Sequence, residues 1–241
     1  PVSLDYTRAI ALDLMGNIYV TGESYGPAGN IDFLTIKINS LGDTLWTRSY
    51  NGTGNGMDVA TDIAVDLLGN VFVTGRSQGA TTDWDYVTIK YNTLGALDWV
   101  SNYNGYVGVS QGQDIPISIC VDDLGNSYVT GNSNVWTGNL DDILTVKYNS
   151  SGDTVWTNRY NGPLSVGDQA YSIKVDDLGN VYVAGYVDAN SSSGTRDFCT
   201  IKYNSAGVQQ WVGRYNGPDS KVDEARALDV DPLGNVFVTG Y

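Results

Sequence analysis

The sequence predicts an all-β fold: a β-propeller of four-stranded antiparallel blades, with four full blades and a C-terminal half-blade, or about five blades. One segment recurs five times with small changes, and one copy is VDDLGNVYVAGY at residues 175–186. An aspartate opens each unit at intervals of 53 to 56 residues, a spacing typical of propeller blades. The composition, with 29 glycines and 17 tyrosines, favours strands and turns over helices. The opening aspartates are Asp5, Asp58, Asp114, Asp168 and Asp223.

These aspartates divide residues 1–241 into repeats within a single predicted propeller domain. The four full repeats cover approximately residues 5–57, 58–113, 114–167 and 168–222, and a half-repeat covers 223–241. A single four-stranded unit cannot bury both of its apolar faces alone. The repetition therefore predicts sheets that stack on one another around an axis.

Each unit begins with two strands joined by a D-x-x-G turn. In the second unit we expect Ile63 and Val65 on one face of the first strand, and Ala60, Asp62 and Ala64 on the other. The turn aspartate can cap backbone amides and the glycine can adopt positive φ, as in a type I turn with a G1 bulge. The second strand is apolar on both faces, which predicts burial between two layers. We interpret these turn residues as structural: Asp13, Asp66, Asp122, Asp176 and Asp231, with Gly16, Gly69, Gly125, Gly179 and Gly234.

Each full unit ends with two further strands. The third strand reads DFLTIKIN, DYVTIKYN, DILTVKYN or DFCTIKYN, and an N-x-x-G turn follows it. The fourth strand carries Trp and Tyr four residues apart, so both rings share one face and are expected to pack between blades. We expect the repeated lysines of the third strand to pair with a repeated aspartate. These lysines are Lys37, Lys90, Lys147 and Lys202.

The units D-x-x-G-N-V-Y-V-T-G, D-[FY]-x-T-I-K-Y-N and W-x-x-x-Y-N-G resemble the SBBP-type bacterial β-propeller repeat across essentially the whole chain. The resemblance implies a propeller fold and an extracellular or cell-surface location. It implies no reaction, because the matching residues are structural in character.

Charge and composition exclude several function classes. The formal net charge is −14, which disfavours contact with nucleic acid. The chain has no histidine, so it cannot form a Ser-His-Asp or Cys-His arrangement. No apolar run is long enough to cross a membrane, and Cys120 and Cys199 occupy non-equivalent places and form no disulfide framework. We expect no cofactor. Ca²⁺ is the one cation to consider, at the repeated aspartates or at the pairs Asp122-Asp123, Asp141-Asp142 and Asp176-Asp177.

The half-repeat leaves three explanations open. Further blades of a longer protein can follow it, a ring of about five blades can end in a two-stranded remnant, or another subunit can complete the half-blade. An exposed strand edge invites pairing with another chain. We therefore expect self-association through the incomplete C-terminal blade, a contact that closes into a ring or continues as a filament.

Loops that differ between repeats are the better guide to function, because binding residues concentrate on loops held by a rigid scaffold. The loops between second and third strands carry four aromatics as candidate interaction residues: Tyr25, Trp84, Trp136 and Tyr186. The leading hypothesis is a non-enzymatic subunit of a cell-surface, filamentous or tubular assembly. The alternative is a secreted module that binds a glycan or a surface protein. A glycosidase with two carboxylates is a third hypothesis, since carboxylates alone suffice for that chemistry.

Overall fold

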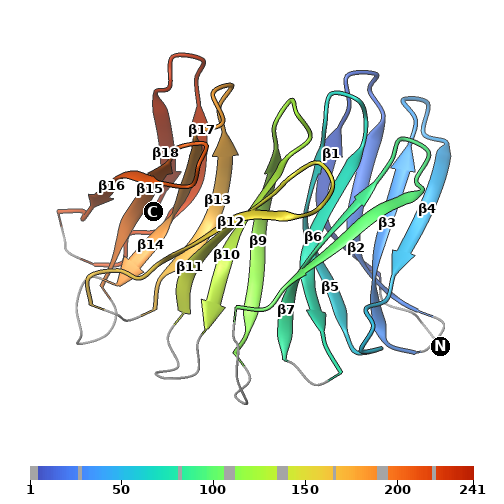
Figure 1. Ribbon diagram of the computed structural model, residues 1–241, viewed down its shortest axis with the longest axis horizontal. Coiled ribbons are helices and arrows are strands. Elements are labelled where there is room, and N and C mark those ends of the chain that lie inside the picture. The colour runs from blue at the N-terminus through green and yellow to red at the C-terminus, as the bar shows by residue number, and fades with distance from the viewer. Residues whose placement is uncertain are drawn as a thin grey trace.

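The protein is built from antiparallel β-sheets in a computed structural model that describes residues 5–26, 29–80, 83–105, 112–134, 141–164, 167–188, 195–218 and 221–241 (Figure 1). The described residues form eighteen strands and no helix, so they contain no helical segment that could span a membrane. Four sheets have four strands and the last has two. The predicted fold class, four blades plus a half-blade, is confirmed.

The strands follow one another in each sheet in chain order. The first sheet contains β1 (Tyr6–Leu12), β2 (Ile18–Tyr25), β3 (Ile31–Ile38) and β4 (Thr44–Tyr50). The second contains β5 (Asp58–Val65), β6 (Val71–Gln78), β7 (Trp84–Tyr91) and β8 (Leu97–Tyr103). The third contains β9 (Asp114–Val121), β10 (Ser127–Asn134), β11 (Asp141–Tyr148) and β12 (Thr154–Tyr160). The fourth contains β13 (Gln169–Val175), β14 (Val181–Asp188), β15 (Arg196–Tyr203) and β16 (Gln209–Tyr215), and the half-blade contains β17 (Ala225–Val230) and β18 (Val236–Gly240).

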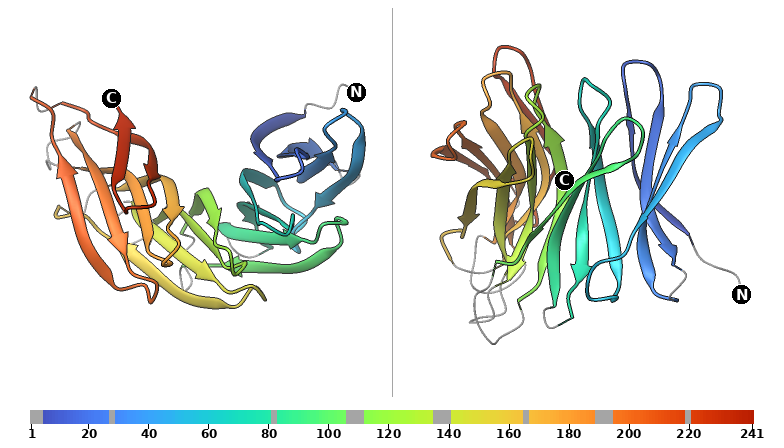
Figure 2. Two further views of the ribbon diagram at one scale, coloured as in Figure 1. Left: turned by 90° about the horizontal axis from the view of Figure 1, so that it is seen from above. Right: turned by 45° about the vertical axis from the view of Figure 1, so that its right-hand side comes forward.

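The sheets stand side by side along an open arc. The first strands of successive sheets, β1, β5, β9, β13 and β17, contact one another in order and line the inner side. Figure 2 shows the first blade and the half-blade at opposite ends of this arc, with the inner side open between them. Each interior sheet is therefore covered on both faces, whereas each end sheet keeps one face uncovered.

A β-bulge interrupts the first strand of every blade. In the second blade Ala60 pairs with Gly75 and Asp62 with Thr74, so Thr61 is the extra residue. The bulge reverses the side-chain alternation, and Ala60 packs in the same cluster as Ile63. The prediction that Ala60 shares a face with Asp62 and Ala64 was therefore wrong.

The core lies between sheets rather than inside any one of them. The second strand of each interior blade is its centre: Val71, Phe72 and Val73 are all fully buried, although they point to alternate faces. This confirms the prediction that strands apolar on both faces are sandwiched. Cys120 and Cys199 are both free cysteines.

Candidate interaction faces at the two ends of the arc

The repeated turn aspartates act as hydrogen-bond acceptors within their own hairpins. Asp13 Oδ1 accepts the backbone N–H groups of Met15 and Asn17, both at 2.9 Å, and its Oδ2 accepts Asn17 Nδ2 at 2.7 Å. Burial raises the pKa of Asp13, but hydrogen bonds from Asn17, Tyr19 and Met15 outweigh it, so the pKa lies below the usual value. Gly16 has a φ of +76°, which a β-carbon would strain. The same arrangement recurs at Asp66, Asp122, Asp176 and Asp231, with positive φ at Gly69, Gly125, Gly179 and Gly234.

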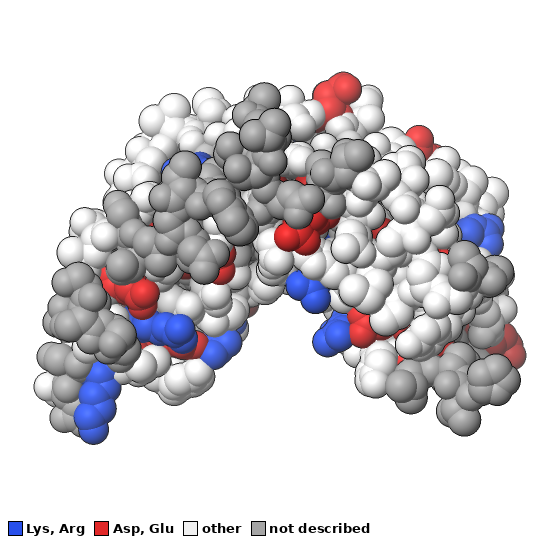
Figure 3. Space-filling model, turned by 90° about the horizontal axis from the view of Figure 1, so that it is seen from below, with Lys and Arg blue, Asp and Glu red and all other residues white. Residues whose placement is uncertain are grey.

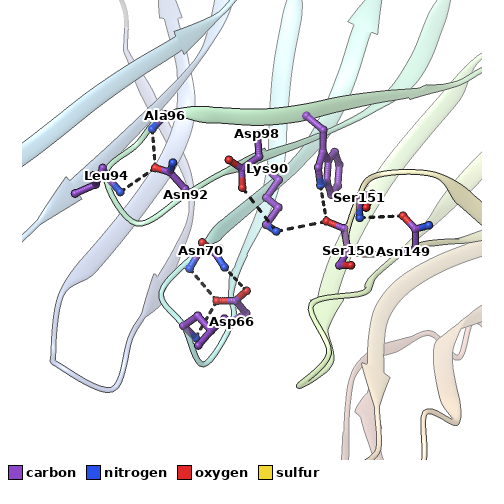
Figure 4. Close-up of polar contacts among 12 residues, drawn as sticks. Asp66, Asn70, Lys90, Asn92, Leu94, Ala96, Asp98, Asn149, Ser150 and Ser151 are labelled. Carbon is purple, nitrogen blue, oxygen red and sulfur yellow. Dashed lines mark hydrogen bonds and ion pairs between the residues drawn. The ribbon is translucent and has the colours of Figure 1, made fainter.

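Each of the first three blades holds the next one through a lysine and a tryptophan. Lys90 Nζ and Trp99 Nε1 both donate to the backbone oxygen of Ser150, a turn residue of the following blade, at 3.4 Å and 3.1 Å (Figure 4). Lys90 also lies over the ring of Phe72 in its own sheet, at 5.4 Å. Equivalent contacts join Lys37 and Trp46 to Thr93, and Lys147 and Trp156 to Ser205.

The expected pairing of these lysines with a repeated aspartate was wrong, because Asp98, the one aspartate near any of them, does not recur in the other blades. Within the described residues, only Lys90 among the four lies within ion-pair distance of an aspartate, 3.7 Å from Asp98 Oδ2. The lysines pair instead with a carbonyl oxygen and an aromatic face. The carbonyl oxygen belongs to a turn of the next blade. The tryptophan of the fourth strand donates to the same oxygen and so holds that turn within reach of the lysine.

Two complementary faces meet at every interior interface. We call the face of a blade that carries Tyr19 in the first blade its front face, and the face that carries Ile63 in the second blade its back face. Tyr19, Phe33 and Trp46 of the first blade pack against Ile63 and Val73 of the second in one cluster. Front faces therefore point towards the C-terminal end of the arc and back faces towards the N-terminal end.

The back face of the first blade is uncovered. Ile10 lies on β1 within this face and is 63% exposed, because no described blade packs against it. The residues at the same repeat position in later blades are 2% to 6% exposed; they are Ile63, Ile119, Ile173 and Leu228. Leu12, Val20, Leu34 and Ile36 extend this apolar surface on β1, β2 and β3.

The front face at the other end is uncovered in the same way. Phe237 on β18 is 61% exposed, whereas its counterparts Tyr19, Phe72, Tyr128 and Tyr182 are fully buried. The half-blade also lacks outer strands, so it leaves the outer part of the fourth blade open. As a result Trp211 is 40% exposed, compared with 8% for Trp46, and Tyr215 is 60% exposed.

The edge of β18 is a second feature of this end. Every other second strand pairs with a third strand, whereas β18 pairs only with β17 among the described strands. Its backbone groups on the far edge are therefore available for a further strand.

The three loop aromatics that the structure describes all lie on strands. Tyr25 ends β2 and is exposed, and Trp84 begins β7 with the Arg76 guanidinium 4.4 Å above its ring. Tyr186 lies within β14 and is buried against Tyr171 and Arg196, so its prediction as an exposed loop residue was wrong. Trp136 and the long crossing at 106–111 lie outside the described residues.

The sequence reasoning missed a non-repeated charged cluster at the half-blade. Glu224 is buried and forms ion pairs with Arg196 and Arg226, and Arg226 lies 4.1 Å from the ring centre of Tyr171. Glu23, the only other glutamate in the chain, pairs with Arg8 in the first blade at 2.6 Å. Figure 3 shows Lys and Arg side chains beside acidic ones towards both ends of the arc. The rarity of glutamate was the signal that could have identified both clusters.

Three of the five opening aspartates are buried. Asp58, Asp114 and Asp168 have little or no exposed surface, and burial raises the pKa of each, to about 6 for Asp168. The described residues contain no cluster of three or more His, Cys, Asp or Glu side chains able to hold a metal ion.

Comparison with known proteins places the chain among propellers. A WD repeat-containing protein of Acanthamoeba polyphaga mimivirus is 25% identical over 150 residues, which is 53% of this chain and 10% of the relative. The chain thus spans a small part of that relative. Among solved structures, an α-L-arabinanase of Penicillium chrysogenum with bound arabinobiose superposes with a TM-score of 0.61 at 11% identity, covering 99% of this chain and 80% of the arabinanase.

The arabinanase comparison corrects the prediction that the chain is not an enzyme. That propeller is itself an enzyme, so the absence of a reaction cannot be inferred from this fold, and the prediction does not stand. The similarity extends to the fold alone at this identity. The sequence profile of the SBBP family, described as a beta-propeller repeat, matches residues 3–27, 45–80 and 106–135. Three segments of the chain therefore match the SBBP beta-propeller repeat.

Proposed function

We propose that this protein is a propeller building block that binds further copies of itself through its two uncovered end faces. The observation that carries the proposal is the exposure of Ile10 and Phe237, at 63% and 61%, at repeat positions that are buried in all other blades. Burying a side chain of this size contributes about 1.5–3 kcal/mol. Two such faces on one molecule give association a substantial driving force.

A second copy fits because the chain supplies both halves of the contact. The back face of the first blade and the front face of the half-blade are the two sides of an interface that the chain already makes between its own blades. A contact between unlike faces is heterologous, so copies joined in this way form a closed ring or an open filament. The free edge of β18 can accept a strand of the second copy, which would also cover Trp211 and Tyr215.

A cell-surface or extracellular assembly is the setting that we propose for this building block. The SBBP repeats and the net charge of −14 support it. A highly charged surface keeps such a protein soluble, so that contacts form at the matched apolar faces. The proposal concerns assembly and does not depend on whether the chain also catalyses a reaction.

Sedimentation velocity over a range of concentrations tests the proposal. The wild-type chain should form species larger than the monomer, and both Ile10→Asp and Phe237→Asp should shift it to monomer. Leu124→Asp is the matched control, because Leu124 is an exposed apolar residue in a turn of an interior blade. Monomers of the wild-type chain at every concentration would reject the proposal, and so would equal loss of association in the control.

Binding of a glycan or a surface protein is the second candidate function. Its support is the non-repeated group of Tyr171, Tyr241 and Arg226, in which the guanidinium lies within 5.1 Å of both ring centres. A tyrosine offers both an apolar ring and a polar hydroxyl for contact with a ligand, and Tyr241 is 65% exposed. A glycan array probed with the Ile10→Asp monomer would test this candidate, and loss of a signal in Tyr241→Ala would support it.

A further inference from the structure

A glycine in the second strand of every blade opens a hollow on the back face of that blade. The five glycines are Gly22, Gly75, Gly131, Gly185 and Gly240. At three interfaces an aromatic ring of the preceding blade enters this hollow so closely that a β-carbon on the glycine would collide with it. At Gly131, for example, the β-carbon would stand 2.7 Å from Tyr86 Oη. The three pairs are Phe33 with Gly75, Tyr86 with Gly131 and Phe198 with Gly240.

The inserted rings share one position of the repeat. Each is the second residue of its third-strand sequence, DFLTIKIN, DYVTIKYN or DFCTIKYN. Phe33 is 1% exposed and packs in one cluster with Val73, Val87 and Ile89 of the second blade. Tyr86 is fully buried, and its hydroxyl has no hydrogen-bond partner among the described residues. These interfaces therefore hold the ring itself and do not require a polar group on it.

In the first blade the same hollow is an open pocket, which we call the Gly22 pocket. Val20, Gly22, Leu34 and Ile36 are among the residues that line it, and its volume is about 200 Å³. The three apolar side chains are partly exposed, because no described blade precedes them. Their counterparts in the second blade are buried in the cluster that contains Phe33; they are Val73, Val87 and Ile89.

The Gly22 pocket has the size and the chemistry for one aromatic ring. An apolar cavity of roughly 150 Å³ can hold one benzene molecule. An aliphatic side chain is a poorer fit to such a hollow. Ile143 stands at the ring position before the fourth blade, and there the atoms nearest to a β-carbon on Gly185 all belong to the backbone of β13. A planar ring therefore enters the hollow more deeply than a branched aliphatic chain does.

We propose that the Gly22 pocket binds one phenylalanine or tyrosine side chain carried by a strand of a partner polypeptide. Between the described blades, the inserted ring comes from the third strand of the preceding blade. The described half-blade contains only β17 and β18, so it has no third strand to supply a ring. A strand paired with the free edge of β18 would occupy that position and place its ring in the Gly22 pocket of the next copy. This last step rests on the proposed function, whereas the pocket itself does not.

A methyl NMR titration of full-length Phe237→Asp tests the pocket, because this variant keeps the back face and is expected to be a monomer. The Ile36 methyl signals should shift saturably with N-acetyl-phenylalaninamide and with N-acetyl-tyrosinamide. N-acetyl-leucinamide should bind several-fold more weakly, since it has no ring. Adding Leu34→Trp should abolish the response, because the indole fills the pocket. Adding Leu12→Trp should preserve it, because Leu12 is exposed on the same blade but does not line the pocket.

Gly22 itself is not a suitable test position, because a β-carbon there would collide with the backbone oxygen of Tyr6. The partner strand is tested with the peptide DYVTIKYN, the third-strand sequence of the second blade. This peptide should increase the association of the wild-type chain in sedimentation velocity. The same peptide with alanine in place of its first tyrosine should not.

The outcomes separate the pocket from the association of copies. No saturable shift with either aromatic probe, or an undiminished shift in the Leu34→Trp variant, would overturn the pocket. Equal effects of the two peptides would overturn the partner strand. A chain that binds the aromatic probes but stays monomeric at every concentration would support the pocket and reject the proposed function.

Discussion

Ile63 and Ile10 stand at the same position of the repeat, yet one is buried between two blades and the other is 63% exposed at the end of the arc. Phe72 and Phe237 make the same comparison for the opposite face. In both cases the side chain, the strand and the turn beside it are equivalent. Only the presence of a neighbouring sheet differs. The position of a residue in the repeat therefore predicts the type of side chain, but it does not predict whether that side chain is buried. The interior interfaces explain the stability of the fold, and the end faces are the surfaces through which we propose that copies of the chain associate.

The largest expected effect is a difference in unfolding free energy between a substitution at an interior interface and the same substitution at an end face. Phe72→Ala should lower the free energy of unfolding by about 3–5 kcal/mol, because it leaves a cavity in a fully buried interface. Phe237→Ala should lower it by less than about 1 kcal/mol in the monomer, since its ring already faces solvent. Urea unfolding at a concentration where the chain is monomeric measures both. Similar losses for the two variants would contradict this account, because they would mean that the Phe237 ring is buried within the monomer.

A pH profile sharpens the comparison at the interior interfaces. Burial raises the pKa of Asp168 to about 6, above its unfolded value. The folded state therefore binds a proton that the unfolded state releases, and stability is lost as the pH rises through 6. We expect the unfolding free energy to be larger at pH 5 than at pH 7 by about 1 kcal/mol from this group.

Asp168→Asn should remove that part of the pH dependence. Chemical denaturation at several pH values between 4 and 8 checks it, with the wild-type chain as reference. An unchanged slope in the variant would assign the titration to other carboxylates, since Asp114 and Asp142 also have raised pKa values through burial.

The smallest expected effect concerns the repeated turns. Asp176 accepts bonds from Leu178, Asn180 and Tyr182, so Asp176→Ala should cost about 1–2 kcal/mol of stability. Asp231 stands at the same position beside Phe237, which has no hydroxyl to donate, and it lies in the exposed half-blade. Asp231→Ala should therefore cost less. Differential scanning calorimetry of the pair would contradict this account if the order were reversed.

Much of the fold could be predicted from the sequence because its determinants are local. The Asp13 and Gly16 turn is a short-range pattern, and its five copies fix the strand pairing within each blade. The bulge at Thr61 could not be predicted, since it depends on how the first strand curves towards its neighbours rather than on the residue itself. The same limit explains why Ala60 was assigned to the wrong face.

The site was less predictable because it depends on contacts between repeats. The sequence pattern predicts that Tyr186 lies on a loop, but β14 extends through it and the Arg196 guanidinium lies over its ring. The sequence pattern predicts that Lys90 forms an ion pair, but Lys90 donates to the backbone oxygen of Ser150 in the turn of the next blade. Neither partner is near in sequence, and no pattern within one repeat identifies them.

Mixing two end-face variants tests the central claim most directly. Ile10→Asp keeps an intact front face and Phe237→Asp keeps an intact back face, so each variant retains one half of the contact. We predict that each sediments alone as a monomer and that an equimolar mixture sediments as a dimer and goes no further. Monomers in the mixture, alongside an associating wild-type chain, would contradict the head-to-tail pairing of these two faces.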